Sequence, residues 1–263
     1  MATQLKIESS NECLFKMNQN LRTVLITGAS SGIGLSTALL FLKKNWYVVC
    51  LAREQKSFDV IKEKLGTNIR NIEFHGVDFT NPSALNVFFQ KKDFKFEYID
   101  ALVNSAGISS KTKIQNMTEE EWEKIFRVNV TCSFKMIKES IKYMNINRSP
   151  TIVNISSIAG RLRSISLSCA YSSSKAALFG MTRHMAMELS NHGIRVNCLA
   201  PGQTLTPMLK SALCEKGQED LAKKLPLKRL SSPEEQANII YFLSSAESSY
   251  INGAIIDSNG GAL

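Results

Sequence analysis

Residues 22–34, RTVLITGASSGIG, decide the fold, because an apolar run passes there into a glycine-rich turn and then into a helix-like pattern. Gly28 would allow a tight turn out of the strand. Gly32 and Gly34 would remove side chains where the chain passes a phosphate and where the helix packs on the strand. The free N–H groups at the helix start would face that phosphate. The stretch therefore predicts a strand, a phosphate-binding loop and a helix in succession.

The same alternation of strand and helix continues to the end of the chain. Apolar runs predict strands at 22–27, 46–51, 71–76, 99–103, 151–155, 194–199 and 253–257, and amphipathic stretches predict helices near 33–44, 57–65, 83–91, 119–144, 171–191 and 234–244. Strands joined through helices require crossovers, and hence a parallel sheet with helices on both faces. We predict an α/β fold, one Rossmann-type doubly wound domain with about seven parallel strands.

Length and composition suit a single domain, because 263 residues with 44% hydrophobic and 21% charged residues can bury a large core. Residues 1–20 are polar, lack the apolar core of a signal peptide, and are expected to form a short extension before a domain over 21–263. No apolar run approaches the roughly 18 residues of a membrane span. The six cysteines form no C-x-x-C pair and have no His at metal spacing, so we expect no metal site and a cytoplasmic setting.

The net charge of +9 is spread along the chain. No block of five or more like charges occurs, so no nucleic-acid-binding arm is expected. A diffuse positive field could attract an anionic cofactor, substrate or carrier. Ordinary solubility is the alternative explanation of the charge.

The glycine spacing G-x-x-x-G-x-G differs from the G-x-G-x-x-G of longer-chain dehydrogenases and resembles the short-chain dehydrogenase/reductase family. The resemblance covers residues 22–263 and implies an enzyme that interconverts a carbonyl and a secondary alcohol by hydride transfer with a nicotinamide cofactor. It also implies which loop residues hold the cofactor, namely Thr27, Gly28, Ser30, Ser31, Gly32, Ile33 and Gly34.

The end of the second predicted strand indicates which cofactor binds. An acidic side chain about twenty residues after the glycines would bind the ribose 2′-OH of NAD, whereas Arg favours the 2′-phosphate of NADP. The strand ends in Cys50-Leu51-Ala52-Arg53, nineteen residues after Gly34, with no acid at its tip. A guanidinium matches a phosphate in charge and geometry. The sequence favours NADP(H) over NAD(H), with Lys56 as a candidate helper; alternatively, Arg53 points into water.

The resemblance implies further cofactor contacts after the third and fourth strands. Asp78, followed by Phe79, would bond the adenine amino group. The segment Asn104-Ser105-Ala106-Gly107 resembles the family's N-N-A-G, with Ser105 in place of the second Asn. Ala106 and Gly107 would keep the wall beside the ribose small.

Tyr171 and Lys175 lie four residues apart on a predicted helix and so share one face. A phenol with a pKa of about 10 is a poor base at neutral pH. A nearby ammonium favours the phenolate, and a pKa nearer the working pH makes a better proton shuttle. A Y-x-x-x-K pair alone is more often a surface pair. The resemblance implies that Tyr171 is the catalytic acid/base and that Lys175 bonds the ribose hydroxyls and poises Tyr171.

Two more residues complete the implied catalytic set. Ser157 stands at the end of the fifth strand in NISSIAG, where α/β sheets place ligands. The resemblance implies that its hydroxyl holds the substrate oxygen, and the S-x-A-G pattern selects Ser157 over the rival candidate Ser156. Asn129 lies within a long predicted helix, where Asn is unfavourable without a reason. The resemblance implies that it disturbs the helix and anchors a water that joins Lys175 to solvent; a satisfied buried Asn is the alternative.

The segment after the sixth strand, residues 201–206, resembles the family's P-G segment, which fixes the nicotinamide carboxamide. Its candidate cofactor residues are Pro201, Gly202, Thr204 and Thr206, of which Thr206 matches the family position best. Residues 203–230 are expected to form a mobile lid, and they hold six Lys or Arg against three Asp or Glu.

The resemblance offers one indication of the substrate. In β-ketoacyl carrier-protein reductases, basic residues dock the acidic carrier, and those positions fall at Arg148 and His192. One basic Arg is thus retained, which points to an acyl thioester, either a small molecule or carrier-bound. A sugar, polyol or steroid is the alternative substrate, and a cofactor-binding protein without catalysis is the alternative class.

The long helices predicted at 119–144 and 171–191 carry apolar residues on more than one side, and such helices are usually buried twice. We expect a homodimer or homotetramer packed through them, as the resemblance also implies. The residues concerned are Phe134, Met136, Ile137 and Ile141 in the first helix and Leu178, Phe179, Met181 and Met185 in the second.

Overall fold

A single seven-stranded sheet runs through the computed structural model, which describes residues 21–53, 59, 63, 71–91, 94–164 and 166–263. The strands lie in the order β3-β2-β1-β4-β5-β6-β7, and each neighbouring pair is parallel. Their bounds are β1 (Thr23–Thr27), β2 (Tyr47–Ala52), β3 (Ile72–Gly76), β4 (Ala101–Asn104), β5 (Thr151–Ile155), β6 (Arg195–Pro201) and β7 (Ile255–Ser258). The predicted parallel sheet of about seven strands is confirmed.

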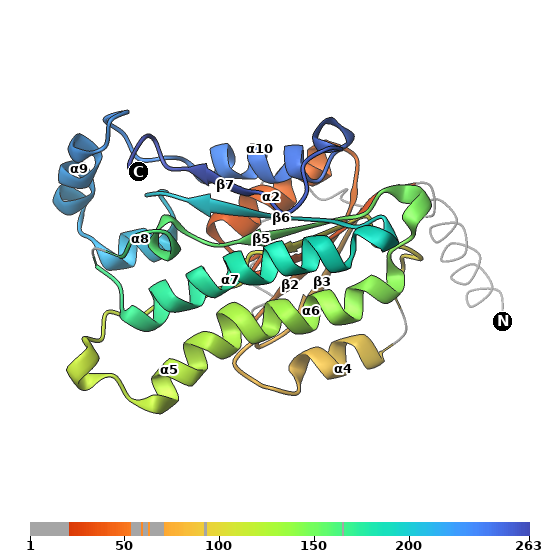
Figure 1. Ribbon diagram of the computed structural model, residues 1–263, viewed down its shortest axis with the longest axis horizontal. Helices are drawn as coiled ribbons and strands as arrows, with labels where there is room; N and C mark the ends of the chain where they lie inside the picture. Colours follow the sequence, from red (N-terminus) through yellow and green to blue (C-terminus); the bar gives the residue numbers. More distant parts are fainter. Residues whose placement is uncertain (1–20, 54–58, 60–62, 64–70, 92–93, 165) are drawn as a thin grey trace.

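Helices cover both faces of the sheet, and consecutive residues of β1 point to opposite layers. Val24 packs in one apolar cluster with α2 (Gly32–Lys43) and α10 (Pro233–Leu243). Leu25 packs in the other cluster with α4 (Ala84–Gln90), α6 (Cys132–Ser140) and α7 (Cys169–Glu188). Figure 1 shows these two helix layers on either side of the strands. The double cover explains why the strands read as continuous apolar runs.

Capping residues begin two helices, α5 and α10, within one residue of the predicted starts at 119 and 234. Ser232 and Glu235 form a reciprocal capping box at the start of α10. Thr118 accepts a hydrogen bond from the Glu121 N–H at the start of α5 (Glu119–Phe126). The helix predicted over 119–144 is interrupted, because a π-helical turn at Arg127–Thr131 separates α5 from α6. Short 3-10 turns lie at Ile114–Asn116, Ile141–Tyr143, Ile146–Arg148, Ile158–Gly160, Ser190–His192 and Ala246–Ser248.

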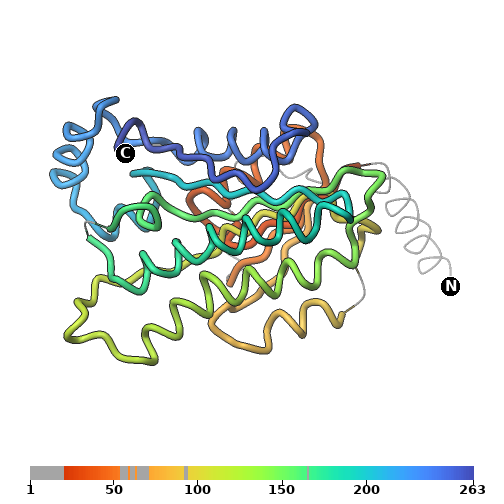
Figure 2. The backbone as a smooth tube through the Cα atoms, in the orientation of Figure 1, coloured from red at the N-terminus to blue at the C-terminus, as the bar shows by residue number. Residues whose placement is uncertain are grey.

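The carboxyl ends of all seven parallel strands lie at one edge of the sheet, and two short helices that follow β6 line the cavity there. These are α8 (Pro207–Ala212) and α9 (Glu215–Lys224), which lie together at one end of the molecule in Figure 2. The expected lid is therefore helical. The Lys111 Nζ donates to the carbonyls of Ser211 at 3.2 Å and Ala212 at 3.0 Å, and so ties the loop after β4 to the end of α8.

Several predictions concern residues outside the described ranges: the extension at 1–20, the candidate helper Lys56, and most of the helix near 57–65. Within the described ranges, no helix is long and apolar enough to cross a bilayer. The same part of the chain holds no group of three or more His, Cys, Asp or Glu placed to bind a metal ion.

Candidate active site

A cavity of about 1090 Å³ opens at the carboxyl edge of the sheet, between the glycine loop, the ends of the central strands and the lid helices. Most of the predicted site residues line it, namely Gly28, Ser30, Ser31, Gly32, Ile33, Gly34, Arg53, Asp78, Phe79, Ala106, Gly107, Ser157, Tyr171, Lys175, Pro201, Gly202, Thr204 and Thr206. Three others, Thr27, Asn104 and Asn129, are buried behind the lining.

The glycine loop is packed so closely that side chains would not fit. Gly28 has a φ of +68°, and a Cβ there would lie 2.8 Å from the backbone of Ala106. A Cβ on Gly34 would lie 2.3 Å from the Gly28 carbonyl oxygen. A Cβ on Gly32 would approach the Thr206 side chain to 3.1 Å. These glycines let the start of α2 open directly onto the cavity with its first N–H groups.

Thr27 and Asn104 shape the wall from behind. The Thr27 hydroxyl accepts hydrogen bonds at 3.1 Å from the N–H groups of Ser105 and Ala106, and so fixes the segment after β4 against the glycine loop. Asn104 donates from Nδ2 to Asn154 Oδ1 at 2.9 Å. Asn154 in turn donates to the Thr182 hydroxyl on α7. Thr27 therefore acts on the cavity through the backbone of Ser105 and Ala106, and Asn104 through a buried side-chain chain that joins β4, β5 and α7.

Arg53 and Asp78 line the cavity at the ends of β2 and β3. Asp78 accepts hydrogen bonds from the N–H and the hydroxyl of Thr80, at 3.0 and 2.8 Å. These bonds, with a smaller effect of the nearby Arg53 guanidinium, lower the pKa of Asp78. Arg53 is exposed and forms no ion pair within the described residues, which leaves its guanidinium available to a ligand.

Tyr171, in the first turn of α7, is 7% exposed and faces Ser157. Burial raises the pKa of the Tyr171 phenol, and a hydrogen bond with Ser157 opposes that rise. The rival residue, Ser156, donates its hydroxyl to the Lys175 carbonyl at 2.7 Å. The serine selected from the sequence is thus the one beside the phenol.

Lys175 is 5% exposed, and burial lowers its pKa to about 8. Its Nζ donates to the Ile155 carbonyl at 2.8 Å and lies 5.7 Å from the centre of the Tyr171 ring. The net direction of the Tyr171 pKa therefore differs from the expected lowering, because burial dominates and the ammonium points to Ile155. A Cβ on Gly107 would lie 3.4 Å from this Nζ, so the predicted small wall keeps space for it.

Asn129 is fully buried in the π-helical turn, so the helix is disturbed where the sequence predicts. It accepts from the Ile108 N–H at 2.8 Å and donates to the Ile108 carbonyl at 3.0 Å. It also donates to the Ser174 hydroxyl at 2.9 Å. A Cβ on Gly107 would lie 3.5 Å from Asn129 Oδ1 and 3.4 Å from the Lys175 Nζ, so both atoms flank the same glycine.

The segment after β6 closes the other side of the cavity. Gly202 lies against Asn259, where a Cβ would come within 2.7 Å of the Asn259 Cα. Thr206 caps α8 by accepting from the Leu209 N–H at 3.3 Å, and its side chain borders Gly32. Thr204 is held by a bridge to Ser231. The predicted residues at 27–34 and 201–206 thus meet across the cavity.

Three supporting residues were not found by sequence reasoning. Ser168 caps α7 by accepting from the Tyr171 N–H, and Ser174 holds Asn129. Gly160 lets the turn after β5 pack against α7, since a Cβ there would lie 2.7 Å from the Ala176 nitrogen and the Lys175 carbonyl carbon. The S-x-A-G pattern contains this glycine, and the pattern could have flagged its packing role.

The family model described as short chain dehydrogenase matches residues 22–216. This chain belongs to the short-chain dehydrogenase family. It is an oxidoreductase that acts on C=O and CH–OH groups, and its family binds NAD(H) or NADP(H).

Curated relatives and solved structures agree with that assignment. The chain is 36% identical to the 3-oxoacyl-(acyl-carrier-protein) reductase of Thermotoga maritima over 91% of this chain and 97% of that protein. It is 33% identical to the same reductase from Vibrio cholerae, over 93% and 98%. A crystal structure of 3-oxoacyl-(acyl-carrier protein) reductase from Brucella melitensis superposes with a TM-score of 0.83 at 32% identity, covering 93% of this chain and 91% of that one.

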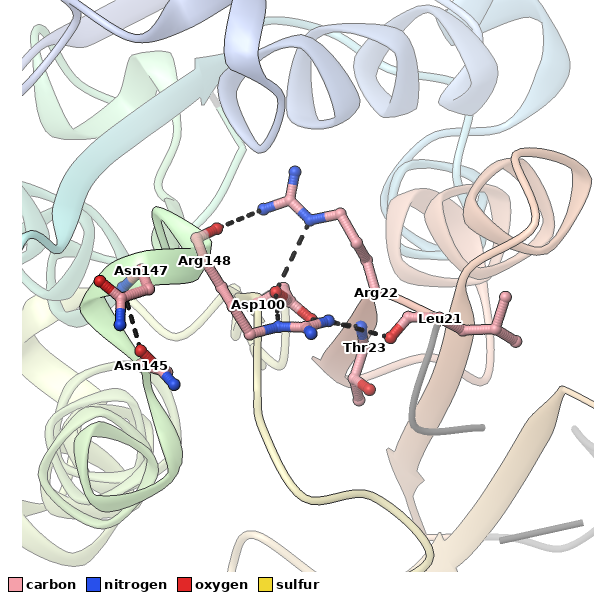
Figure 3. A network of polar contacts seen from close by, with 7 residues as sticks. All are labelled: Leu21, Arg22, Thr23, Asp100, Asn145, Asn147 and Arg148. Atoms are coloured by element: carbon pink, nitrogen blue, oxygen red, sulfur yellow. Dashed lines mark hydrogen bonds and ion pairs between the residues drawn. The ribbon is translucent and has the colours of Figure 1, made fainter. Parts of the chain in front are cut away.

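In this short-chain dehydrogenase, Arg148 and His192 lie far from the cavity, before β5 and β6 at the amino ends of the strands. Arg148 donates to both oxygens of the fully buried Asp100, from Nε at 2.7 Å and Nη2 at 3.0 Å, and also to the Leu21 carbonyl (Figure 3). Arg22 lies 3.6 Å from the same carboxylate. The retained basic residue is thus held in an internal network, which removes the sequence argument for carrier docking at Arg148.

Proposed function

We propose that this chain is an NADP(H)-dependent reductase of 3-oxoacyl thioesters, with residues 21–263 acting as one cofactor-binding domain. The observation that carries the proposal is the placement of Tyr171, Ser157 and Lys175 on the wall of a cavity that also contains the glycine loop. The names of the reductases from Thermotoga maritima and Vibrio cholerae support the thioester part.

The residues present fit a dinucleotide. Side chains at Gly28, Gly32 or Gly34 would meet protein atoms within 3.1 Å, so glycine is needed for the loop to hold the start of α2 against the cavity. The N–H groups at the start of α2 would bind the pyrophosphate. Arg53, which is exposed and has no ion pair among the described residues, would bind a 2′-phosphate, which supports NADP(H) over NAD(H). When bound, the nicotinamide supplies or accepts the hydride.

The chain's own residues would perform the proton transfer. Tyr171 and Ser157 hydrogen-bond the substrate oxygen, and Tyr171 donates its proton to that oxygen as the carbonyl becomes an alcohol. A phenol with the usual pKa of about 10 is protonated at neutral pH, and burial raises the pKa of Tyr171 further, so Tyr171 carries the proton that reduction requires. Lys175, with a pKa of about 8, is a buried cation close enough to the working pH to pass protons inward.

The outer part of the cavity favours an acyl chain over a sugar or polyol. The loop after β5 and the lid helices bring six large apolar side chains to its lining, namely Leu162, Leu167, Met208, Leu209, Leu213 and Leu221. Leu162 is 64% exposed at this wall, a large apolar surface that a substrate can cover. An acyl chain gains free energy by covering these side chains, whereas a sugar hydroxyl placed directly against a leucine loses its hydrogen bonds to water.

The decisive assay is NADPH oxidation with a panel of acetoacetyl thioesters, simple ketones, sugars, polyols and a keto-steroid. We expect the highest kcat/KM for the thioesters. A higher kcat/KM for a sugar or steroid would make that compound, and not the thioester, the proposed substrate class. Absence of turnover with every carbonyl would support the alternative of a catalytically silent protein.

We also propose that the protein forms an oligomer, although fewer apolar side chains of the long helices are exposed than the sequence suggests. Met136, Ile137, Leu178 and Phe179 are buried within the protomer, so they leave little apolar surface for a partner. Other apolar side chains on the long helices are exposed, namely Trp122 (37%), Phe134 (45%) and Met187 (68%). We propose a homodimer or homotetramer packed through these helices; light scattering at micromolar concentration tests it.

The unbridged thiols of Cys50, Cys132, Cys169, Cys198 and Cys214 support a reducing, cytoplasmic setting.

A further inference from the structure

Two basic residues line the outer part of the cavity, where the large apolar side chains lie. Arg163 belongs to the loop between β5 and α7, and Lys224 ends α9. Neither forms an ion pair or a side-chain hydrogen bond within the described residues. Both are exposed, so each charge is available to whatever enters between the loop and the lid.

The other charged residues of the cavity are already assigned or paired. Arg53 and Asp78 lie at the ends of β2 and β3, and Lys175 lies beside Tyr171. Asp220, the remaining acid, lies 3.7 Å from Lys223 on the same helix. Within the described part of the chain, the cavity therefore presents two unpaired cations beside the leucines of the same loop and of the lid helices.

Such an arrangement suits a molecule with an apolar reacting end and an anionic group remote from it. The leucines would cover the acyl part near Tyr171, and the cations would bind the anion. Arg148 cannot supply this charge at the cavity, because it is bonded to Asp100 at the opposite edge of the sheet.

We infer that Arg163 and Lys224 determine substrate specificity by binding the phosphate of a phosphopantetheine thioester. Coenzyme A and an acyl carrier protein both present this phosphate, so it is the chemistry that the two sources share. The inference rests on the proposed thioester reduction and assigns to it two residues that act on substrate selection, not on the hydride step.

The test compares kcat/KM for three substrates: acetoacetyl-coenzyme A, acetoacetyl carrier protein, and acetoacetyl-N-acetylcysteamine, which has no phosphate. Arg163→Ala and Lys224→Ala should each lower kcat/KM for the two phosphate-bearing substrates by about tenfold, the size of one charge-assisted hydrogen bond. The value for the uncharged thioester should change by less than about twofold. Added salt should weaken the binding of the two phosphate-bearing substrates to the parent enzyme. The same effect should be much smaller in the double variant Arg163→Ala/Lys224→Ala.

Lys216→Ala is the matched control, because Lys216 is an exposed lysine of the same helix that does not line the cavity. It should leave all three values unchanged. The dissociation constant of NADPH, measured by fluorescence, should also stay the same in every variant.

Three results would overturn the inference: equal losses for charged and uncharged thioesters, a loss confined to the carrier protein, or weaker NADPH binding. The first would indicate a general structural effect, the second a contact with the carrier's surface, and the third a cofactor site. Failure of the proposed function is distinguishable, since the parent enzyme would then reduce none of the three thioesters.

Discussion

Arg148 donates hydrogen bonds from Nε and Nη2 to the two carboxylate oxygens of Asp100, a residue with no exposed surface. The Thr23 N–H also donates to this carboxylate, at 2.8 Å, so the pair fixes the start of β1 and the loop before β5 to the start of β4 (Figure 3). A buried ion pair of this kind is costly to break from one side, because the Asp100 carboxylate stays desolvated and keeps only the more distant Arg22, at 3.6 Å, as a charged partner.

Arg148→Ala should therefore lower the free energy of unfolding by about 3 kcal/mol, measured by urea denaturation at a fixed protein concentration. The double variant Asp100→Asn/Arg148→Ala should lose less than the sum of the two single variants, because the two residues are coupled. An unchanged unfolding midpoint, together with a selective loss of carrier-thioester reduction, would return Arg148 to the docking role that the sequence suggested.

The cofactor preference depends on Arg53. Arg53→Ala should weaken NADPH binding by about 1.5–3 kcal/mol, the cost of a hydrogen bond to a charged group, and leave NADH binding nearly unchanged. Fluorescence titration with both cofactors measures the difference. Equal losses for NADPH and NADH would mean that Arg53 contributes to the shape of the site and does not recognise the 2′-phosphate.

The sequence predicts the sheet and the glycine loop well because both depend on local rules. The inner strands β1, β2 and β4 are continuous apolar runs, and the glycine spacing places Gly28 and Gly34 where close backbone contacts exclude a side chain. The lid helices were not predicted, although Thr206 followed by Pro207 is a recognisable helix start.

Long-range partners are what sequence reasoning could not supply. The position of Arg148 matches a basic site of related reductases, but its partner Asp100 lies 48 residues earlier in the chain and is brought close by the fold. Likewise, the Y-x-x-x-K spacing identifies Lys175, but only the packing of α7 on β5 shows that its Nζ bonds the Ile155 carbonyl. The direction of the Tyr171 pKa was missed for the same reason, since burial depends on the whole fold.

Glu73 on β3 gives the fold an acid-sensitive contact. Burial raises its pKa, but hydrogen bonds with His75 and Tyr47, at 2.9 and 2.5 Å, outweigh burial and leave the pKa below its usual value. A carboxyl group with a lowered folded-state pKa contributes stability above its unfolded pKa of about 4.3 and loses it as the pH falls through the folded value. Glu73→Gln should flatten the fall in stability below about pH 4.3, measured by urea denaturation across that range. An unaltered acid limb would show that the contact does not contribute.

Lys175 should cost the folded protein stability. Its pKa of about 8 lies below the usual value of 10.5, so the folded state holds fewer protons than the unfolded state between these two values. Stability should therefore rise with pH across that window in the cofactor-free enzyme. Lys175→Met removes the buried charge and should stabilise the protein at pH 7 by about 1–2 kcal/mol, after the loss of the bond to Ile155. Urea denaturation from pH 7 to about pH 10.5 tests both statements. A less stable variant that keeps the alkaline rise would contradict them.

Tyr171 carries the proposed chemistry, so its hydroxyl is the most informative atom to remove. Tyr171→Phe keeps the buried ring, and folding and NADPH binding should survive. The turnover number for thioester reduction should fall by at least about a hundredfold, the low end for loss of a general acid. Because burial raises the Tyr171 pKa, reduction by the parent enzyme should persist into the alkaline range, where the phenol is still protonated. Oxidation of the alcohol needs the phenolate and should rise with pH.

The neighbouring serines provide the control for this prediction. Ser157→Ala should also reduce turnover, whereas Ser156→Ala should do so far less, because the Ser156 hydroxyl is bonded to the Lys175 carbonyl. The double variant Tyr171→Phe/Ser157→Ala should be hardly slower than the worse single variant, since residues that act as a unit are not additive. Stopped-flow measurement of the hydride step separates these effects from product release. Near-normal turnover of Tyr171→Phe on a verified substrate would mean that another group delivers the proton, and the cofactor assignment would still stand on Arg53 and the glycine loop.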